Sequence, residues 1–224
     1  MSAHAVAVLL FSQPASAEAG RKPMGPNGRR TLRLLHALTR AKVRLSGLPL
    51  LESRTLIDHT GTFGEQLQQA VRVAFERGYE RLICIGNDCP DLTVTDLRRA
   101  ARLLTNGQLP LGADLRGGVY LIGLHRDGFN GAAFARLPWQ TAQLAGALRT
   151  FFAGAAVAEL TARTDLNRPA DAGRVRWTGG LPGRLMDALR QCLARPLPFF
   201  ARFVLPVVAV SAGPHWIGRA PPVA

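Results

Sequence analysis

Two carboxylates follow a short apolar segment of the sequence, in a position that suits ligand binding. The chain reads L-I-C-I-G-N-D-C-P-D-L-T over residues 82–93, so Asp88 and Asp91 come soon after four apolar residues. Those four residues predict a strand buried on both faces, and Gly86 lets the backbone turn at its end. In open α/β sheets, ligands bind just beyond the carboxyl ends of the strands. Asp88 therefore either belongs to a binding site or only caps a turn, and its spacing does not choose between the two.

Basic residues ahead of a predicted helix indicate a second kind of chemistry, the binding of phosphate. Arg21, Lys22, Arg29 and Arg30 lie in or beside a segment rich in Pro, Gly and Ala at residues 13–28, which we interpret as a linker. An amphipathic helix is expected to follow it, and the N-terminal amides of a helix bind anions. The sequence has no Gly-x-Gly-x-x-Gly or Walker spacing here, so a solvated basic loop is the alternative.

Length and charge narrow the class of protein. A chain of 224 residues is long enough for one moderately large domain with an appendage. The net charge is +13, and the excess lies at the two ends. Lys and Arg outnumber Asp and Glu by nine to three in residues 1–60 and by seven to one in residues 173–224. Such ends favour phosphate-bearing ligands, acidic membrane surfaces or nucleic acid.

The cysteines and the apolar segments bear on location. Cys84, Cys89 and Cys192 have no paired spacing, which argues against a disulfide framework or a zinc site. Residues 5–11 imitate an export signal, but no Lys or Arg precedes them, so we interpret them as a first buried strand of a cytoplasmic protein. No segment reaches the roughly twenty apolar residues that span a bilayer. Residues 197–212 come nearest, and we expect a packed tail there, with a surface anchor as the alternative.

Local signals along the chain alternate between strands and helices, which is typical of a mostly parallel sheet covered by helices. Capping boxes at Thr62 with Glu65 and at Thr93 with Asp96 predict helix starts on both sides of the 82–93 segment. A strand is expected at 119–124, and a further helix at 181–193.

Three further positions each have a structural and a functional interpretation. Gly117 and Gly118 either form a turn or let a ligand approach the main chain. Trp139 is either a pocket wall or a core residue, and Thr141 is the expected N-cap of the helix that follows.

Several of these motifs, in this order, resemble the DUF2064 family. They are G-T-F-G-E-Q-L (61–67), I-G-N-D-C-P-D-L (85–92), G-G-V-Y-L-I-G-L (117–124), L-P-W-Q-T (137–141) and D-L-N-R-P-A-D (165–171). The family is similar to glycosyltransferases of the A-type fold and, more distantly, to nucleotidyltransferases. The resemblance covers residues 5–172 and implies a Rossmann-like three-layer α/β/α sandwich with a mostly parallel central sheet. We expect residues 173–224 to form a basic, Pro-rich C-terminal extension with one helix.

The resemblance also implies an activity: transfer of a sugar from a nucleotide-diphospho-sugar, with Mg²⁺ or Mn²⁺ neutralising the diphosphate. Asp88 and Asp165 match the expected metal ligands, and both Asp88 and Asp91 are candidate catalytic residues. Candidate contacts to the nucleotide and the substrate are Arg21, Lys22, Asn87, Gly117, Gly118, Trp139 and Thr141. The acceptor is unknown. No specific nucleic-acid partner is expected, and the tail offers a membrane-surface or dimer contact.

Two departures from the family pattern limit what the resemblance carries over. The basic segment after the first strand reads A-E-A-G-R-K-P-M-G-P-N-G-R-R-T, unlike the family's phosphate-facing segment, and Arg116 stands where many members have an acid. Asp171 is expected to be structural. Two alternatives therefore stay open: nucleotidyl transfer from a nucleoside triphosphate, and a catalytically weak protein that binds polyanions through its basic ends.

Overall fold

The computed structural model describes residues 6–13, 15–22, 24, 27–175 and 183–194. Its strands are β1 (Val6–Leu10), β2 (Leu50–Glu52), β3 (Arg81–Ile85), β4 (Leu109–Ala113), β5 (Val119–His125) and β6 (Val157–Glu159). Its α-helices are α1 (Ala15–Arg21), α2 (Gly28–Ser46), α3 (Phe63–Glu76), α4 (Val94–Thr105), α5 (Gly131–Ala135), α6 (Leu144–Phe151) and α7 (Gly183–Ala194). Two 3₁₀ turns, η1 (Ser53–Thr55) and η2 (Pro169–Arg174), complete the described elements.

The strands form one sheet in the order β2-β1-β3-β5-β4-β6. β1 pairs in parallel with β2 and β3, and β4 pairs in parallel with β6, whereas β5 is antiparallel to both of its neighbours. Of the six strands, β5 alone therefore runs in the opposite direction, and the predicted mostly parallel sheet is confirmed. The carboxyl ends of β1, β3 and β4 consequently meet the beginning of β5 at one edge of the sheet.

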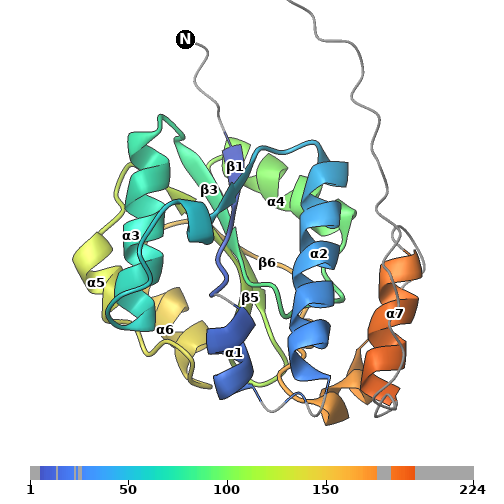
Figure 1. The fold of residues 1–224 in the computed structure, drawn as a ribbon. Coiled ribbons are helices and arrows are strands. Elements are labelled where there is room, and N and C mark those ends of the chain that lie inside the picture. Colours follow the sequence, from blue (N-terminus) through green and yellow to red (C-terminus); the bar gives the residue numbers. More distant parts are fainter. Residues whose placement is uncertain (1–5, 14, 23, 25–26, 176–182, 195–224) are drawn as a thin grey trace, which may run out of the picture.

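Helices cover both faces of the sheet (Figure 1). α3, α5 and α6 lie on one face, and α2 and α4 lie on the other. The core between the layers is apolar. Consecutive residues of β1 and β3 point alternately toward the helices on the two faces of the sheet, and they are buried on both faces. The fully buried examples are Leu9, Leu10, Leu82 and Ile83. This arrangement is the expected three-layer α/β/α sandwich.

The capping boxes are where the sequence predicts them. Thr62 accepts a hydrogen bond from Glu65 N while the Glu65 carboxylate accepts from Thr62 N, and Thr93 and Asp96 repeat the pattern at the start of α4. The predicted linker at 13–28 is wrong in part, since α1 lies within it. Its Ala and Gly residues suit a loop as well as a helix, and α1 is stabilised by contacts distant in sequence.

The predicted helix at 181–193 corresponds to α7, which packs against α2. Leu189 and Cys192 of α7 are buried with Leu32 and Leu35 of α2 in a second apolar cluster. The expected tail at 197–212 lies outside the described residues. No described helix is long and apolar enough to cross a membrane.

Candidate active site

The edge where β1 and β3 end is the foundation of the site. Leu10 is paired with Ile85 at the last register position, and Phe11 N donates to Ile85 O at 2.9 Å. Beyond the sheet, the segment after β1 (residues 11–13) and the segment after β3 (residues 86–88) run side by side. The predicted position of Asp88 beyond a buried strand is therefore what the structure has.

Asp88 is held by a cation and by its own backbone turn. Lys22 Nζ donates to Asp88 Oδ2 at 2.7 Å, and both side chains are about one-fifth exposed (21% and 22%). Gly86 makes room for this carboxylate, because a Cβ at Gly86 would lie 2.6 Å from Asp88 Oδ1. Burial opposes the charge of Lys22, but Asp88, Glu18 and Asp165 together outweigh it, so the pKa of the ammonium lies above its ordinary value.

Asp165 reaches the same place from a distant part of the chain. The neighbouring Leu166 N donates to Asp88 O at 2.7 Å, which fixes the 163–167 segment beside the end of β3. The Asp165 side chain lines the cavity, yet the residue is only 8% exposed, and its Oδ1 has no hydrogen-bond partner among the described residues. Burial raises its pKa well above the ordinary value, and the charges of Asp88 and Asp114 raise it further.

Asp114 is a third carboxylate at this edge, and the sequence reasoning missed it. Its Oδ1 accepts from Arg116 N and from Gly118 N, both at 2.7 Å, and so shapes the turn between β4 and β5. A signal was present: Asp114 ends the apolar L-P-L-G-A segment just as Asp88 follows the end of β3. Because no strand is predicted at residues 109–113, Asp114 was not recognised as a residue that follows the end of a strand.

Helix α1 covers the loop after β3. Glu18 is buried, and its carboxylate accepts from Asn87 Nδ2 at 3.1 and 3.3 Å and from Gln13 N at 3.2 Å. Glu18 thereby ties α1 to the ends of both β1 and β3. Sequence reasoning missed Glu18 because it treated this segment as a linker.

A buried lysine supports the same loop from α2. Lys42 Nζ donates to Pro90 O at 2.6 Å, and the residue is only 8% exposed. Burial lowers the pKa of Lys42 from 10.5 to about 8, although the carboxylates of Asp91 and Asp96 oppose that shift. The loop that carries Asp88 is thus held by two contacts, one from Lys42 of α2 and one from Glu18 of α1.

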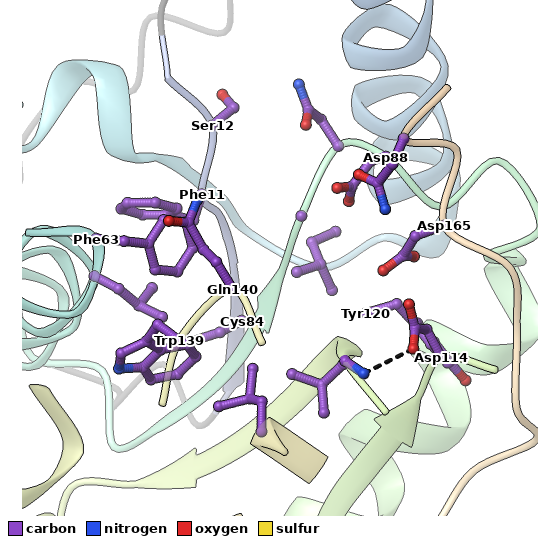
Figure 2. A pocket seen from close by; sticks show the side chains of 18 of the residues that line it. Phe11, Ser12, Phe63, Cys84, Asp88, Asp114, Tyr120, Trp139, Gln140 and Asp165 are labelled. Carbon is purple, nitrogen blue, oxygen red and sulfur yellow. Dashed lines mark hydrogen bonds between the residues drawn. The ribbon is translucent and has the colours of Figure 1, made fainter. Parts of the chain in front are cut away.

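A cavity of about 540 Å³ opens at this edge, within the size range of small-molecule sites. Its two ends differ in chemistry. Figure 2 shows Asp88, Asp165 and Asp114 on one side and Phe11, Phe63 and Trp139 on the other. Arg21, Lys22 and Arg116 also line the cavity. We call the first group, with Lys22, the ionic end and the three aromatic residues the aromatic end.

The rings of the aromatic end pack on one another. The Phe11 and Phe63 centroids are 5.0 Å apart, and those of Phe63 and Trp139 are 5.7 Å apart. Trp139 Nε1 donates to Phe134 O at 2.9 Å, and the Phe134 ring lies behind it at 4.8 Å. Trp139 is therefore both a cavity wall and part of the packing. Gln140, which follows it, has a φ of 62°, the one positive φ among the described non-glycine residues.

Most of the predicted site residues come together here. Those that line the cavity are Arg21, Lys22, Asn87, Asp88, Gly118, Trp139, Thr141 and Asp165. Asp91 is not brought to the cavity: it is 2% exposed, and its charge acts on Lys42 under the loop. Gly117 does not line it either. Its φ is 87° and a Cβ would lie 2.0 Å from Ala142 O, so the close approach that requires glycine is to the protein's own backbone.

The expected N-cap role of Thr141 is wrong. α6 begins at Leu144 with Gln143 as its N-cap, while Thr141 Oγ1 donates to Pro138 O at 2.8 Å and accepts from Gln143 N. The hydroxyl closes the turn ahead of the helix instead.

Arg116 forms an ion pair with the buried carboxylate of Asp171, whose Oδ2 also accepts from Asn167 N at 3.0 Å. These contacts lower the pKa of Asp171 despite burial, and they fit the structural role expected for it.

The carboxylates fit a divalent cation in a limited way. Among the described residues, no group of three or more His, Cys, Asp or Glu side chains is arranged to hold a metal ion. Asp88 and Asp165 nevertheless present hard oxygen donors, and the buried Oδ1 of Asp165 lacks a partner. Mg²⁺ in phosphate-binding sites commonly takes one or two carboxylates together with phosphate oxygens and water. The donor set therefore suits a cation shared with a ligand and does not form a complete protein cage.

The sequence also matches a known family. A sequence model with the description "Uncharacterized protein conserved in bacteria (DUF2064)" matches residues 30–141, half of the chain. The chain belongs to the DUF2064 family. The matched range contains the end of β3 with Asp88, as well as Asp114 and Trp139, and the predicted membership is confirmed. No curated protein matches the sequence.

Solved structures support the fold of this DUF2064 protein. A "putative nucleotide-diphospho-sugar transferase" from Desulfovibrio desulfuricans G20 aligns with a TM-score of 0.66 at 17% identity, covering 84% of this chain and 96% of that one. Rv0371c from Mycobacterium tuberculosis H37Rv aligns at 0.46 and 17% identity, covering 78% and 98%, and its complex with manganese aligns at 0.45 and 15%, covering 77% and 98%. At these identities the first alignment shows the fold, and scores below 0.5 add nothing to it.

Proposed function

We propose that this protein is a metal-dependent glycosyltransferase that transfers a sugar from a nucleotide-diphospho-sugar to an acceptor. One observation carries the proposal: Asp88 and Asp165 converge with Lys22 at the end of a cavity that has the size of a small-molecule site. Acids beside cations are what a metal–diphosphate group requires, since the acids bind the metal and the cations bind phosphate oxygens. The nucleotide-diphospho-sugar transferase fold is consistent with this assignment.

The residues take separate tasks under this proposal. Lys22 and Arg21 bind the phosphate oxygens, and Asn87 keeps the loop after β3 in place through Glu18. Asp88 and Asp165 hold Mg²⁺ or Mn²⁺, which supplies electrostatic stabilisation to the departing diphosphate. Trp139, Thr141 and Gly118 line the space left for the sugar and the acceptor.

The proposed reaction breaks the bond between the anomeric carbon and the diphosphate oxygen and forms one from that carbon to an acceptor oxygen. The acceptor hydroxyl loses its proton to solvent and the nucleoside diphosphate leaves as the second product, so atoms and charges balance. Asp91 has no part in it, because its side chain is buried away from the cavity.

A thermal-shift experiment tests the binding part of the proposal. Nucleoside diphosphates and nucleotide sugars should raise Tm more with Mn²⁺ than without it, because ligands that bind only the folded state stabilise that state. Asp88→Asn should abolish the Mn²⁺-dependent part. Asp127→Asn is the matched control, since Asp127 is exposed beyond the opposite end of β5. An unchanged Mn²⁺-dependent shift in Asp88→Asn would remove Asp88 from the site.

Product analysis tests the reaction itself. Labelled nucleotide sugars should yield a labelled acceptor and free nucleoside diphosphate. Release of pyrophosphate from a nucleoside triphosphate would instead identify a nucleotidyltransferase. Salt-sensitive binding to polyanions without any metal-dependent affinity for nucleotides would contradict both transferase assignments.

A further inference from the structure

We propose that Lys22 is a resident counter-cation that a divalent cation displaces from Asp88, and that the freed ammonium then binds the phosphate groups of the ligand. This inference rests on the proposed function, because it assigns an order of contacts within the same site. Its consequence is that metal and phosphate ligand each strengthen the binding of the other.

The first observation is that Lys22 already forms an ion pair with Asp88, one of the two predicted metal ligands. Lys22 Nζ lies 2.7 Å from Asp88 Oδ2, the distance of a strong charge-assisted hydrogen bond. A divalent cation bound to Asp88 Oδ2 would therefore lie close to the positive charge of the Lys22 ammonium. The two cations therefore compete for one carboxylate.

The second observation is a buried carboxylate that is only partly satisfied, because Cys89 contacts it but one of its oxygens has no hydrogen-bond partner among the described residues. Asp165 is more than nine-tenths buried, lines the cavity, and has an Oδ1 without a hydrogen-bond partner among the described residues. Asp114 Oδ1, in contrast, accepts from two backbone N–H groups. Among the described residues, Lys22 is the cation paired with Asp88, and Asp165 keeps an oxygen without a hydrogen-bond partner. A divalent cation on Asp88 and Asp165 would balance both.

The third observation concerns the freedom of Lys22. Its side chain lines the cavity and is about one-fifth exposed (21%), and among the described residues its ammonium donates to Asp88 alone. A lysine has a long flexible stem and rotatable donors, so the ammonium can turn from one acceptor to another. Arg21 lines the same cavity, and none of the ion pairs found among the described residues includes it. Both positive charges are therefore near the position of an incoming phosphate.

These observations predict reciprocal coupling between metal and ligand. In the ligand-free protein, Mn²⁺ must displace Lys22, which weakens its binding. When a nucleoside diphosphate is bound, the displaced ammonium gains phosphate oxygens as partners, and this cost disappears. By linkage, the ligand tightens Mn²⁺ by the same factor as Mn²⁺ tightens the ligand, and such factors are typically about 5- to 150-fold.

The experiment measures Mn²⁺ binding directly, by the loss of the free-ion electron paramagnetic resonance signal during titration, with and without UDP as the probe. Lys22→Met should lower the Kd for Mn²⁺ in the ligand-free protein by about tenfold, a factor within the usual range of coupling, and reduce the effect of UDP. Lys22→Arg, which keeps a cation, should stay close to the wild type. Arg21→Met is the matched control, because it removes the same charge from the next residue.

The outcomes separate the exchange from the proposed function. If Lys22→Met and Arg21→Met lower the Kd equally, the cause is the general field, and the exchange at Asp88 is wrong. If neither variant changes the Kd while Asp88→Asn abolishes Mn²⁺ binding, the exchange is wrong and the metal site stands. If Asp88→Asn binds Mn²⁺ as tightly as the wild type with UDP present, both the exchange and the metal site are wrong.

Discussion

The two ends of the cavity are built on opposite principles. At the aromatic end, Phe11, Phe63 and Trp139 fill one another's surfaces, with Phe134 fully buried behind them. At the ionic end, Lys22 pairs with Asp88, but the buried carboxylate of Asp165 keeps an oxygen without a hydrogen-bond partner among the described residues. Packing of apolar rings stabilises a fold, whereas burial of partly paired charges destabilises it.

The difference indicates which end a ligand would complete. Asp165 lines the cavity, and its buried Oδ1 has no hydrogen-bond partner among the described residues, so a ligand or cation in the cavity can supply one. The rings of the aromatic end belong to the packing of the core, whereas under the proposed function the ionic end would be completed by a metal ion and the phosphate groups of a ligand. Substitutions at the two ends should therefore change stability in opposite directions.

The largest effect is expected directly behind the aromatic end, in the packing that supports its rings. Phe134→Ala removes a fully buried ring that contacts Trp139, Phe129 and Phe151, and should cost about 3–5 kcal/mol of unfolding free energy. Urea denaturation measures it. Leu115→Ala is the control, because Leu115 is 66% exposed and its loss should change stability by less than about 0.5 kcal/mol. A small loss at Phe134 would contradict the view that this end is core.

The support beneath the ionic end should show a pH-dependent effect. Burial lowers the pKa of Lys42 from 10.5 to about 8, so between these pH values the unfolded state binds more protons than the folded one. The stability of the wild type should therefore rise with pH across this window, by an amount on the order of 3 kcal/mol from this group. Lys42→Met should lack that rise. Parallel stability curves for the two proteins between pH 7.5 and about 10.5 would show that folding does not lower the pKa of Lys42.

Asp165→Asn should stabilise the protein while impairing its site. The folded-state pKa of Asp165 is raised, so above its ordinary value of 3.8 the folded state binds more protons than the unfolded one, and stability falls as pH rises. The variant should be more stable by about 1 kcal/mol at neutral pH, or about 2–4 °C in Tm, and this advantage should shrink toward pH 4. Calorimetry at both pH values measures it. An Asn variant that is less stable at pH 7 would show that the carboxylate is fully compensated.

The smallest effect is expected at the mouth of the cavity. Gln140 has a φ of 62°, a conformation that costs a non-glycine residue about 1–2 kcal/mol and a glycine almost nothing. Glycine also has a more flexible unfolded state, so Gln140→Gly should gain about 1 kcal/mol or less. Gln140→Ala keeps the conformational cost and serves as the control. A loss of stability in the glycine variant, measured by urea denaturation, would mean that the Gln140 side chain holds the turn.

The sequence predicts the ionic end better than its surroundings. Asp88 follows an apolar strand, and the capping boxes of α3 and α4 are local patterns, so both are visible without the fold. Glu18 and Asp114 are harder to find, although Asp114 follows an apolar segment, because α1 and β4 contain Ala, Gly and Pro residues with weak local preferences for helix or strand. Asp91 shows the reverse error, since nearness to Asp88 in sequence says nothing about the direction of its side chain.

The hydrogen bond from Leu166 N to Asp88 O ties the middle of the chain to a segment beyond the last strand. Every strand of the sheet precedes Leu166 in the sequence. The sheet can therefore form before Asp88 and Asp165 are brought together, and under the proposed function affinity for metal would appear only with that final docking. Metal binding would then report complete folding, which the presence of the sheet alone does not.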